Sequence, residues 1–312
     1  MSEVHLVVNP AAGAGRFRGR QLELRNLVER AGATVTTHEP QSPDHAARLF
    51  SELAASNVER VIVAGGDGTV HLAAQALTGS STVLGVLPVG SGNDFARALG
   101  LPGGDPAAAV RHALGRPIAL DVLRSAHGVV VSVATAGFSA RVNERGNRLR
   151  LPDVASRFRY QLATVVELRT LVPSPIRIEL DDEPPIELDA TLLAVANTAY
   201  FGGAMAICPD ADPTDGVAEL TVVGPTSRRE FLRTVRRVMT GTHLSHPAVS
   251  TFRARRVRLL GDDLAVWGDG EPHADADVTL WVDAGALAVA APVWHAAAGP
   301  RERSHDVGSG PQ

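Results

Sequence analysis

The sequence predicts an α/β fold in two parts: an N-terminal Rossmann-like domain with a parallel sheet, and a C-terminal antiparallel β-sandwich domain. The candidate active site lies in the cleft between them. Apolar strands alternate with helices over residues 4–123, which is typical of parallel sheets. Beyond residue 124, strand-like runs separated by Asp, Glu, Pro and Gly turns dominate. We expect domains at 1–124 and 125–298, and leave open whether the last segment returns to the first domain. A polar disordered tail follows at 299–312.

The elements of the first domain are predicted from apolar runs and their stop signals. Each strand is a short Val, Ile or Leu run, and the first helix ends at Gly32. The predicted strands are 4–8, 35–38, 60–64, 83–87 and 118–123. The predicted helices are 18–31, 44–55, one starting at 69, and 105–114. Because ligands bind beyond the carboxyl ends of such strands, the turns that follow these strands are the candidate binding loops.

The elements of the second domain are mostly strands, separated by turn residues. The predicted strands are 129–134, 176–180, 186–195, 218–223, 255–260, 264–267, 278–282 and 286–290. Two helical stretches, 155–171 and 228–239, interrupt them. This pattern favours an antiparallel sandwich.

The composition excludes several classes of protein. The chain is 45% hydrophobic with a net charge of -4, which gives no sign of nucleic-acid binding. Cys208 is the only cysteine, so a disulfide framework or a cysteine-rich zinc site within one chain is excluded. The N-terminus lacks the regions of a signal peptide, and no apolar run reaches the roughly 18 residues of a membrane helix. We expect a cytoplasmic protein.

The chain contains no lysine, because all 30 basic residues are arginine. A Walker-type loop needs a lysine on the phosphates, and a protein kinase needs a strand lysine. Both are excluded, as is Schiff-base chemistry. Any phosphate charge must therefore be met by arginine, backbone N–H groups or metal.

The run Gly-Gly-Asp-Gly-Thr at 65–69 is the most informative stretch. It follows the apolar residues 61–64 and precedes a helix-like segment, 70–77. A strand, a glycine turn and a helix start point backbone N–H groups at an anion. Asp67 suits a site that holds phosphate together with Mg²⁺. The alternative is an ordinary turn in which Asp67 caps the helix.

Two further glycine-rich turns follow predicted strands. Residues 9–16 read Asn-Pro-Ala-Ala-Gly-Ala-Gly-Arg, in which small residues permit close approach of a phosphate and Arg16 supplies charge. A dinucleotide-binding fingerprint fails because Arg18 stands at its third glycine. Residues 88–97 form the other turn, which carries Asp94. Together the three turns predict one nucleotide pocket.

Other carboxylates stand out by their surroundings. Asp121 lies inside an apolar strand, which is costly unless it is paired, hydrogen-bonded, near a metal or at an exposed strand end. Asp269 and Glu271 flank a glycine after an aromatic strand, and one of them could act as general base for a hydroxyl. Residues 209–217 hold three aspartates in a turn-rich stretch, which suits a hard cation or a solvated turn.

These motifs resemble those of the diacylglycerol kinase catalytic-domain family, in particular the soluble bacterial lipid kinases related to sphingosine and ceramide kinases. The matching pieces run in family order over about residues 4–291. They are Asn9-Pro10-x-x-Gly13-x-Gly15, 65–69, Pro88-x-Gly90-Ser91-x-Asn93-Asp94, Gly137-Phe138, Asn197…Phe201-Gly202-Gly203, Pro209-Asp210-Ala211…Asp215-Gly216 and Asp269-Gly270-Glu271. The run at 65–69 is shared with NAD kinases and phosphofructokinases, and the later motifs favour a lipid kinase.

The resemblance implies ATP as phosphate donor, Mg²⁺ as cofactor and a lipid alcohol as substrate. The implied cofactor-binding residues are Asn9, Pro10, Gly13, Gly15, Arg16, Thr37, Gly65, Gly66, Asp67, Gly68, Thr69, Gly90, Ser91, Asn93 and Asp94. The implied catalytic residues are Asp269 as general base, Glu271 beside it, and Asp67. The implied catalytic Mg²⁺ network is formed by Asp67, Asp94 and Asp121. A second, structural Mg²⁺ is implied at the Asp215 side chain and the backbone carbonyls of Asp212 and Val217. Thr214 departs from the family's aspartate there.

A lipid substrate requires access to a bilayer, and two groups of arginines could provide it. They are Arg141, Arg145, Arg148, Arg150, Arg157 and Arg159, and Arg228, Arg229, Arg233, Arg236 and Arg237. We expect peripheral docking on an anionic membrane, with a solvated helix face as the alternative. Two other functions stay open: NAD kinase-like phosphorylation of a soluble alcohol, and a non-catalytic nucleotide or lipid sensor. A homodimer also stays open.

Overall fold

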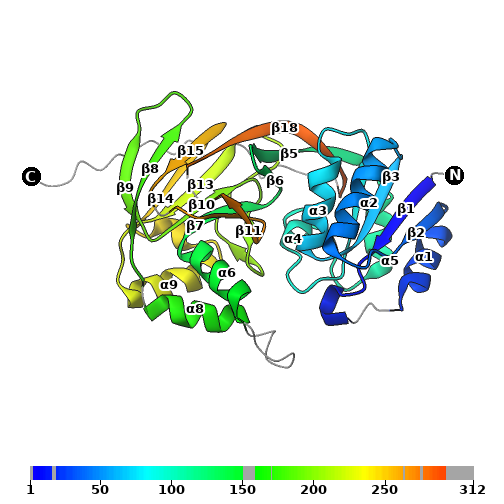
Figure 1. The fold of residues 1–312 in the computed structure, drawn as a ribbon, viewed down its shortest axis with the longest axis horizontal. Coiled ribbons are helices and arrows are strands. Elements are labelled where there is room, and N and C mark those ends of the chain that lie inside the picture. Colours follow the sequence, from blue (N-terminus) through cyan, green and yellow to red (C-terminus); the bar gives the residue numbers. More distant parts are fainter. Residues whose placement is uncertain are drawn as a thin grey trace, which may run out of the picture.

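The computed structural model describes residues 3–15, 19–149, 159–169, 171–262, 264–274 and 277–292. The predicted fold class is confirmed: a parallel-sheet α/β part is followed by an antiparallel part, and the two lie side by side (Figure 1). The expected disordered tail at 299–312 lies outside the described residues. None of the helices in the described ranges is long and apolar enough to cross a membrane.

The N-terminal part is a parallel sheet covered by helices on both faces. Its strands, in the spatial order β2-β1-β3-β4, are β1 (Glu3–Val8), β2 (Thr34–His38), β3 (Arg60–Gly65) and β4 (Val83–Pro88). Its helices are α1 (Gln21–Arg30), α2 (Pro43–Ala55), α3 (Asp67–Leu77), α4 (Asp94–Ala98) and α5 (Pro106–Ala113). A short 3-10 helix, η1 (Ala12–Gly15), follows β1.

The alternation of side chains along β3 explains why both faces of this sheet are covered. Val61 and Val63 pack in one core cluster with Phe50 of α2. Ile62 packs in another with Leu24 of α1. Because successive strand residues point to opposite faces, a fully apolar strand requires a helical layer on each side.

The C-terminal part packs two sheets face to face, and its described helices lie outside them. One sheet has the order β14-β13-β10-β7-β16-β17, and the other contains β18-β15-β8-β9 with β5 and β6. The strands are β5 (Pro117–Ser125), β6 (Gly128–Val130), β7 (Val133–Gly137), β8 (Ser174–Leu180), β9 (Ile186–Ala190), β10 (Leu192–Ala196), β13 (Ala218–Val223), β14 (Val249–Ala254), β15 (Arg256–Leu260), β16 (Val266–Gly268), β17 (Glu271–Ala274) and β18 (Val278–Ala290). A separate hairpin joins β11 (Tyr200–Phe201) to β12 (Met205–Ala206).

The core of the sandwich lies between its sheets, and the outer face of the six-stranded sheet is covered by helices. The inner cluster includes Leu193, Leu220 and Ile178. On the outer face lie α6 (Phe138–Arg148), α8 (Arg159–Arg169) and α9 (Arg228–Val238), with Phe138 and Phe231 stacked edge to face at a centroid distance of 4.8 Å. A 3-10 turn, η2 (His243–Ser245), follows α9.

β18 connects the two parts. Its first half pairs with β15, and its end, at Val289 and Ala290, pairs in parallel with β4. Its antiparallel pairing with β5 runs along most of both strands. One sheet of the sandwich is therefore continuous with the parallel sheet, as the long orange ribbon in Figure 1 shows.

Several predicted boundaries differ from the structure. The single strand expected at 129–134 is two strands, because the N–H groups of Val131 and Ser132 donate to Asp269. The strand expected at 186–195 divides at Thr191 into β9 and β10, which belong to different sheets. The two strands expected at 278–290 form one irregular strand, β18. Helix α6 and strand β14 were not expected at all.

Candidate active site

Two of the glycine turns pack backbone against backbone at the carboxyl ends of β3 and β4. A Cβ built on Gly90 would lie 2.5 Å from Cα of Gly66. The N–H of Val89 donates to the carbonyl of Gly65 at 3.1 Å. Such an approach tolerates no side chain at position 90, so the two turns form one surface.

The third turn joins this surface through Asn9. The Nδ2 of Asn9 donates to Oγ1 of Thr69 at 2.8 Å, and its backbone N–H donates to the carbonyl of Ala64 at 3.0 Å. The structure thus brings the loops after β1, β3 and β4 together, with the start of α3 between them. Pro10, Gly13, Gly68 and the exposed Ser91 belong to the same loops. Arg16 lies outside the described residues.

Asp67 and Asp94 form an acidic pair beside this surface. Oδ1 of Asp67 accepts the N–H of Phe95 at 3.2 Å, and a Cβ on Gly92 would lie 2.8 Å from its Oδ2. Burial raises the pKa of Asp67, and the charge of Asp94 raises it further, although backbone N–H groups of residues 93–95 oppose the change. The pair therefore carries negative charge that a cation would stabilise.

Asp94 also joins the two halves of the chain. Its carboxylate accepts N–H groups from Gly203 and Ala204, both at 2.7 Å, in the turn between β11 and β12. Three successive residues, 202–204, have positive φ values of 61°, 85° and 83°. Successive N–H groups in this conformation form a concave anion site.

Asp269 lies at a second point where the halves meet. Its Oδ2 accepts the N–H of Val131 at 2.9 Å and contacts Nδ1 of His71 on α3 at 2.9 Å, and its Oδ1 accepts the N–H of Ser132 at 2.8 Å. The Asp269 side chain is only 3% exposed. Glu271, two residues on, is exposed.

Asp121 lies against the loop at 213–216. Its carboxylate accepts N–H groups from Gly216 at 2.7 Å and Gly285 at 2.8 Å, and its own N–H donates to the carbonyl of Pro213. Burial raises the pKa of Asp215, and the charges of Asp212 and Asp121 add to the increase. The structure therefore brings Asp121 to the loop that was expected to hold a structural metal, and its place in the catalytic Mg²⁺ network stays a prediction.

The loop at 212–217 is closed by its own hydrogen bonds and by an arginine. Asp215 accepts the N–H of Val217 at 3.1 Å and pairs with Arg253. Asp212 accepts the N–H and hydroxyl of Thr214. In the described part of the chain, no three His, Cys, Asp or Glu side chains converge as metal ligands.

Thr37 lies at the carboxyl end of β2, two strands from β3. Its buried hydroxyl has no hydrogen-bond partner within the described ranges. An orphan hydroxyl of this kind is available to a ligand.

Comparisons with known proteins identify the family. Residues 3–125 match the diacylglycerol kinase catalytic domain, and residues 132–291 match the YegS C-terminal NAD kinase beta sandwich-like domain. A diacylglycerol kinase of Mycobacterium tuberculosis is 34% identical over 278 residues, which are 87% of this chain and 89% of that protein. The chain belongs to the diacylglycerol kinase family of lipid kinases. The resemblance read from the motifs is confirmed.

Further diacylglycerol kinases are similar to this chain over most of its length. The Bacillus subtilis diacylglycerol kinase is 27% identical over 279 residues, covering 87% of this chain and 90% of its own. A crystal structure of a diacylglycerol kinase from Bacillus anthracis has a TM-score of 0.70 at 20% identity and covers 94% of this chain and 97% of that one. At that identity the structural likeness shows the fold alone.

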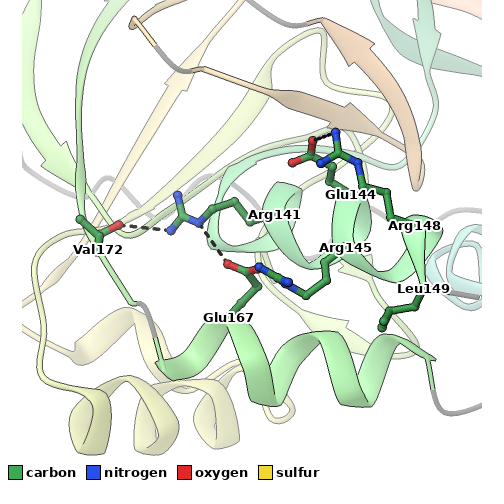
Figure 2. Close-up of a pocket in the computed structure, with 7 residues that line it drawn as sticks. All are labelled: Arg141, Glu144, Arg145, Arg148, Leu149, Glu167 and Val172. Carbon is green, nitrogen blue, oxygen red and sulfur yellow. Dashed lines mark hydrogen bonds and ion pairs between the residues drawn. The ribbon is translucent and has the colours of Figure 1, made fainter.

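Two hollows accompany the site. One, of about 390 Å³, lies beside the turn after β4 and is lined by Gly90, Asn93 and Arg20 among others. The other, of about 490 Å³, lies between α6 and α8, and none of Asp67, Asp94 and Asp269 lines it (Figure 2). In Figure 2, Arg141 and Arg145 point at the buried Glu167, and Arg148 pairs with Glu144. Three arginines against two glutamates make this hollow only weakly basic.

The sequence interpretation missed His71 and Gln75. Both lie on α3, one and two turns beyond Asp67, at positions i+4 and i+8. Helical spacing puts residues four apart on one face, so the spacing could have directed attention to them. It could not have shown that Asp269, 198 residues away, lies against that face.

Proposed function

We propose that this protein transfers the γ-phosphoryl group of ATP to the hydroxyl of diacylglycerol or a similar lipid alcohol, with Mg²⁺ and with Asp269 as general base. The observation that carries the proposal is the convergence of three glycine turns, the Asp67–Asp94 pair and Asp269 where the halves of the chain meet. Membership of a lipid kinase family supports it.

The phosphate end of the site works without lysine. Backbone N–H groups of the turns at 9–15, 65–69 and 90–93, with the N-terminus of α3, supply partial positive charge to a phosphate. Asp67 and Asp94 fit a hard cation, because their paired charge lies in a partly buried place beside these turns. When bound, Mg²⁺ neutralises charge on the transferred phosphoryl group. Asn9, Ser91 and Thr37 are the residues proposed to contact ATP.

Asp269 has the properties of a base for an alcohol. Two backbone N–H groups and His71 donate to its carboxylate and hold it in one orientation. A carboxylate has about four acceptor positions, so three donors leave one for a hydroxyl. During transfer the hydroxyl oxygen forms a bond to the γ-phosphorus, its proton passes to Asp269, and ADP leaves. Glu271 adds negative charge at the edge of the site.

A basic face on α9 supports peripheral membrane docking. Phe231, Thr234 and Val238 face the protein, while Leu232 and the adjoining Met239 are 47% and 51% exposed. The exposed arginines of this helix are Arg228, Arg229, Arg233, Arg236 and Arg237. Arginines beside exposed apolar side chains suit an anionic bilayer surface. Arg150 and Arg157 of the other group lie outside the described residues, and the side chain of Arg159 is not described.

The remaining expectations stay predictions. A structural Mg²⁺ at Asp212, Asp215 and Val217 competes with Arg253, whose guanidinium already neutralises Asp215. The division into 1–124 and 125–298, cytoplasmic location and homodimer formation stay predictions as well. Among the described residues, no contact favours a soluble alcohol or a sensor role over a lipid kinase.

An acceptor panel tests the proposal. Purified protein with labelled ATP and Mg²⁺ is given diacylglycerol in phosphatidylglycerol vesicles, ceramide in the same vesicles, or NAD. We expect label in the diacylglycerol product. Label in NAD alone would show a soluble-alcohol kinase, and ATP binding without transfer to any acceptor would show a sensor.

A further inference from the structure

The Asp269 carboxylate is held by a chain of contacts that begins on the neighbouring helix. Nδ1 of His71 lies 2.9 Å from Oδ2 of Asp269, and Nε2 of His71 lies 3.2 Å from Nε2 of Gln75. His71 and Gln75 are one turn apart on α3, so both present the same face. This series of contacts therefore connects Asp269, the candidate base, to α3, the helix that starts at the phosphate turn.

Val129 fixes which way the Gln75 amide points. Its carbonyl accepts from Nε2 of Gln75 at 2.6 Å, and its N–H donates to Oε1 at 3.0 Å. Flipping the amide would break both bonds, so Nε2 must face His71. A Cβ on Gly128 would lie 2.7 Å from Oε1, so the neighbouring glycine leaves room for this arrangement.

The orientation of Gln75 fixes the tautomer of His71. Because the Gln75 amide nitrogen is a donor, the facing Nε2 of a neutral His71 must accept. The proton of the ring then resides on Nδ1 and points at Asp269. Burial lowers the pKa of His71, but the hydrogen bond and charge of Asp269 and the charge of Glu271 raise it above its ordinary value. Nδ1 carries a proton in the imidazolium as well, so the bond to Asp269 persists in both forms.

We propose that His71 is a positioning residue for the reaction: its Nδ1–H, fixed by Gln75 and the Val129 backbone, holds the Asp269 carboxylate in the orientation that receives the proton of the acceptor hydroxyl. The inference rests on the proposed function, in which Asp269 is the base. Asp269 lies in a turn with φ of +52°, which non-glycine residues rarely adopt, and a side chain at such a position depends on its surroundings for its direction. His71 is the side chain that supplies this support, while Val131 and Ser132 supply backbone donors.

Four variants test the inference with vesicle-bound dioctanoylglycerol as acceptor. H71F keeps an aromatic side chain but removes the N–H donor, and H71N places an amide nitrogen near the Nδ1 position. D269N removes the base. H112F is a matched His-to-Phe change on α5. We expect H71F to lower kcat about 10- to 100-fold, as for a misplaced catalytic group. The KM for ATP and the Kd for ATP should stay near those of the wild type. H71N should recover most of kcat, and H112F should match the wild type.

The double variant H71F/D269N separates this inference from the proposed function. If His71 acts through Asp269, H71F should cost nothing further in the D269N background. Unchanged kcat in H71F, or H71N as slow as H71F, would overturn the positioning role while leaving Asp269 as base. Full transfer by D269N would instead overturn the proposed function. Should H71F fold poorly, Q75M gives the same test. We expect Q75M to lose the NMR resonance of the His71 Nδ1–H proton and to lower kcat. An unchanged resonance and an unchanged kcat in Q75M would contradict the proposed orientation of His71 by Gln75.

Discussion

Asp94 and Ala204, 110 residues apart, are joined by a hydrogen bond of 2.7 Å from the backbone N–H of Ala204 to the Asp94 carboxylate. The bond connects the start of α4 to the turn between β11 and β12, and so connects the phosphate loops to the C-terminal half. The turn holds Ala204 at φ of 83°, a value that suits glycine.

Replacing Ala204 by glycine should stabilise the protein. The left-handed conformation costs an alanine about 1–2 kcal/mol, and the extra freedom of unfolded glycine offsets part of the gain. We expect the free energy of unfolding to rise by about 0.5–1 kcal/mol. Ala47→Gly, inside helix α2, is the matched control and should lose about 1 kcal/mol. Equal losses in both variants by urea unfolding would contradict the assignment of strain to Ala204.

Gly90 should not tolerate a side chain. A Cβ there would lie 2.5 Å from Cα of Gly66, so Gly90→Ala must push the two phosphate turns apart. We expect a loss of about 1–3 kcal/mol in unfolding free energy and weaker ATP binding. Gly103→Ala is the control, because no atom lies within 4 Å of its Cβ and its φ is ordinary. ATP titration of both proteins checks this, and equal affinities would argue against the turns as the phosphate site.

The His71–Asp269 pair should make stability depend on pH. The folded pKa of His71 is raised above its unfolded value, so its contribution is full below about pH 6.5 and is lost as pH rises through the folded pKa. A charged hydrogen bond contributes about 1.5–3 kcal/mol and a neutral one about 1 kcal/mol. H71F should therefore lose more unfolding free energy at pH 6 than at pH 9. In the D269N background this difference should shrink, because only the charge of Glu271 then raises the pKa of His71; an undiminished difference would contradict the assignment to Asp269.

Neutralising the basic face of α9 should weaken vesicle binding. Each arginine near an anionic surface contributes about 1 kcal/mol, so the triple change R229Q/R233Q/R236Q should lower the partition onto phosphatidylglycerol vesicles about 100-fold at low salt. The triple change R30Q/R48Q/R111Q, on exposed positions of α1, α2 and α5, removes the same charge elsewhere. Equal losses in both would indicate a net-charge effect, and no loss in the first would exclude α9 as the docking face.

The sequence predicted what local patterns determine. Alternating strands and helices gave the parallel sheet, and the turns at 65–69 and 88–97 were placed at adjacent strand ends because parallel strands share one carboxyl edge. The break between β6 and β7 was missed because Val131 and Ser132 stand in a mostly apolar, strand-like run, yet their N–H groups donate to Asp269. The backbone partners of Asp121 were not predicted for a similar reason: Gly216 and Gly285 are distant in the chain, and no spacing encodes such contacts.

The most direct measurement of the central claim is single-turnover transfer of labelled phosphate from ATP to diacylglycerol by the wild type and by D269N, with ATP affinity measured in parallel. General-base catalysis contributes about 10²- to 10⁴-fold, so D269N should transfer phosphate more slowly by that factor while its ATP affinity stays unchanged. A D269N protein that binds ATP and transfers phosphate at the wild-type rate would contradict it.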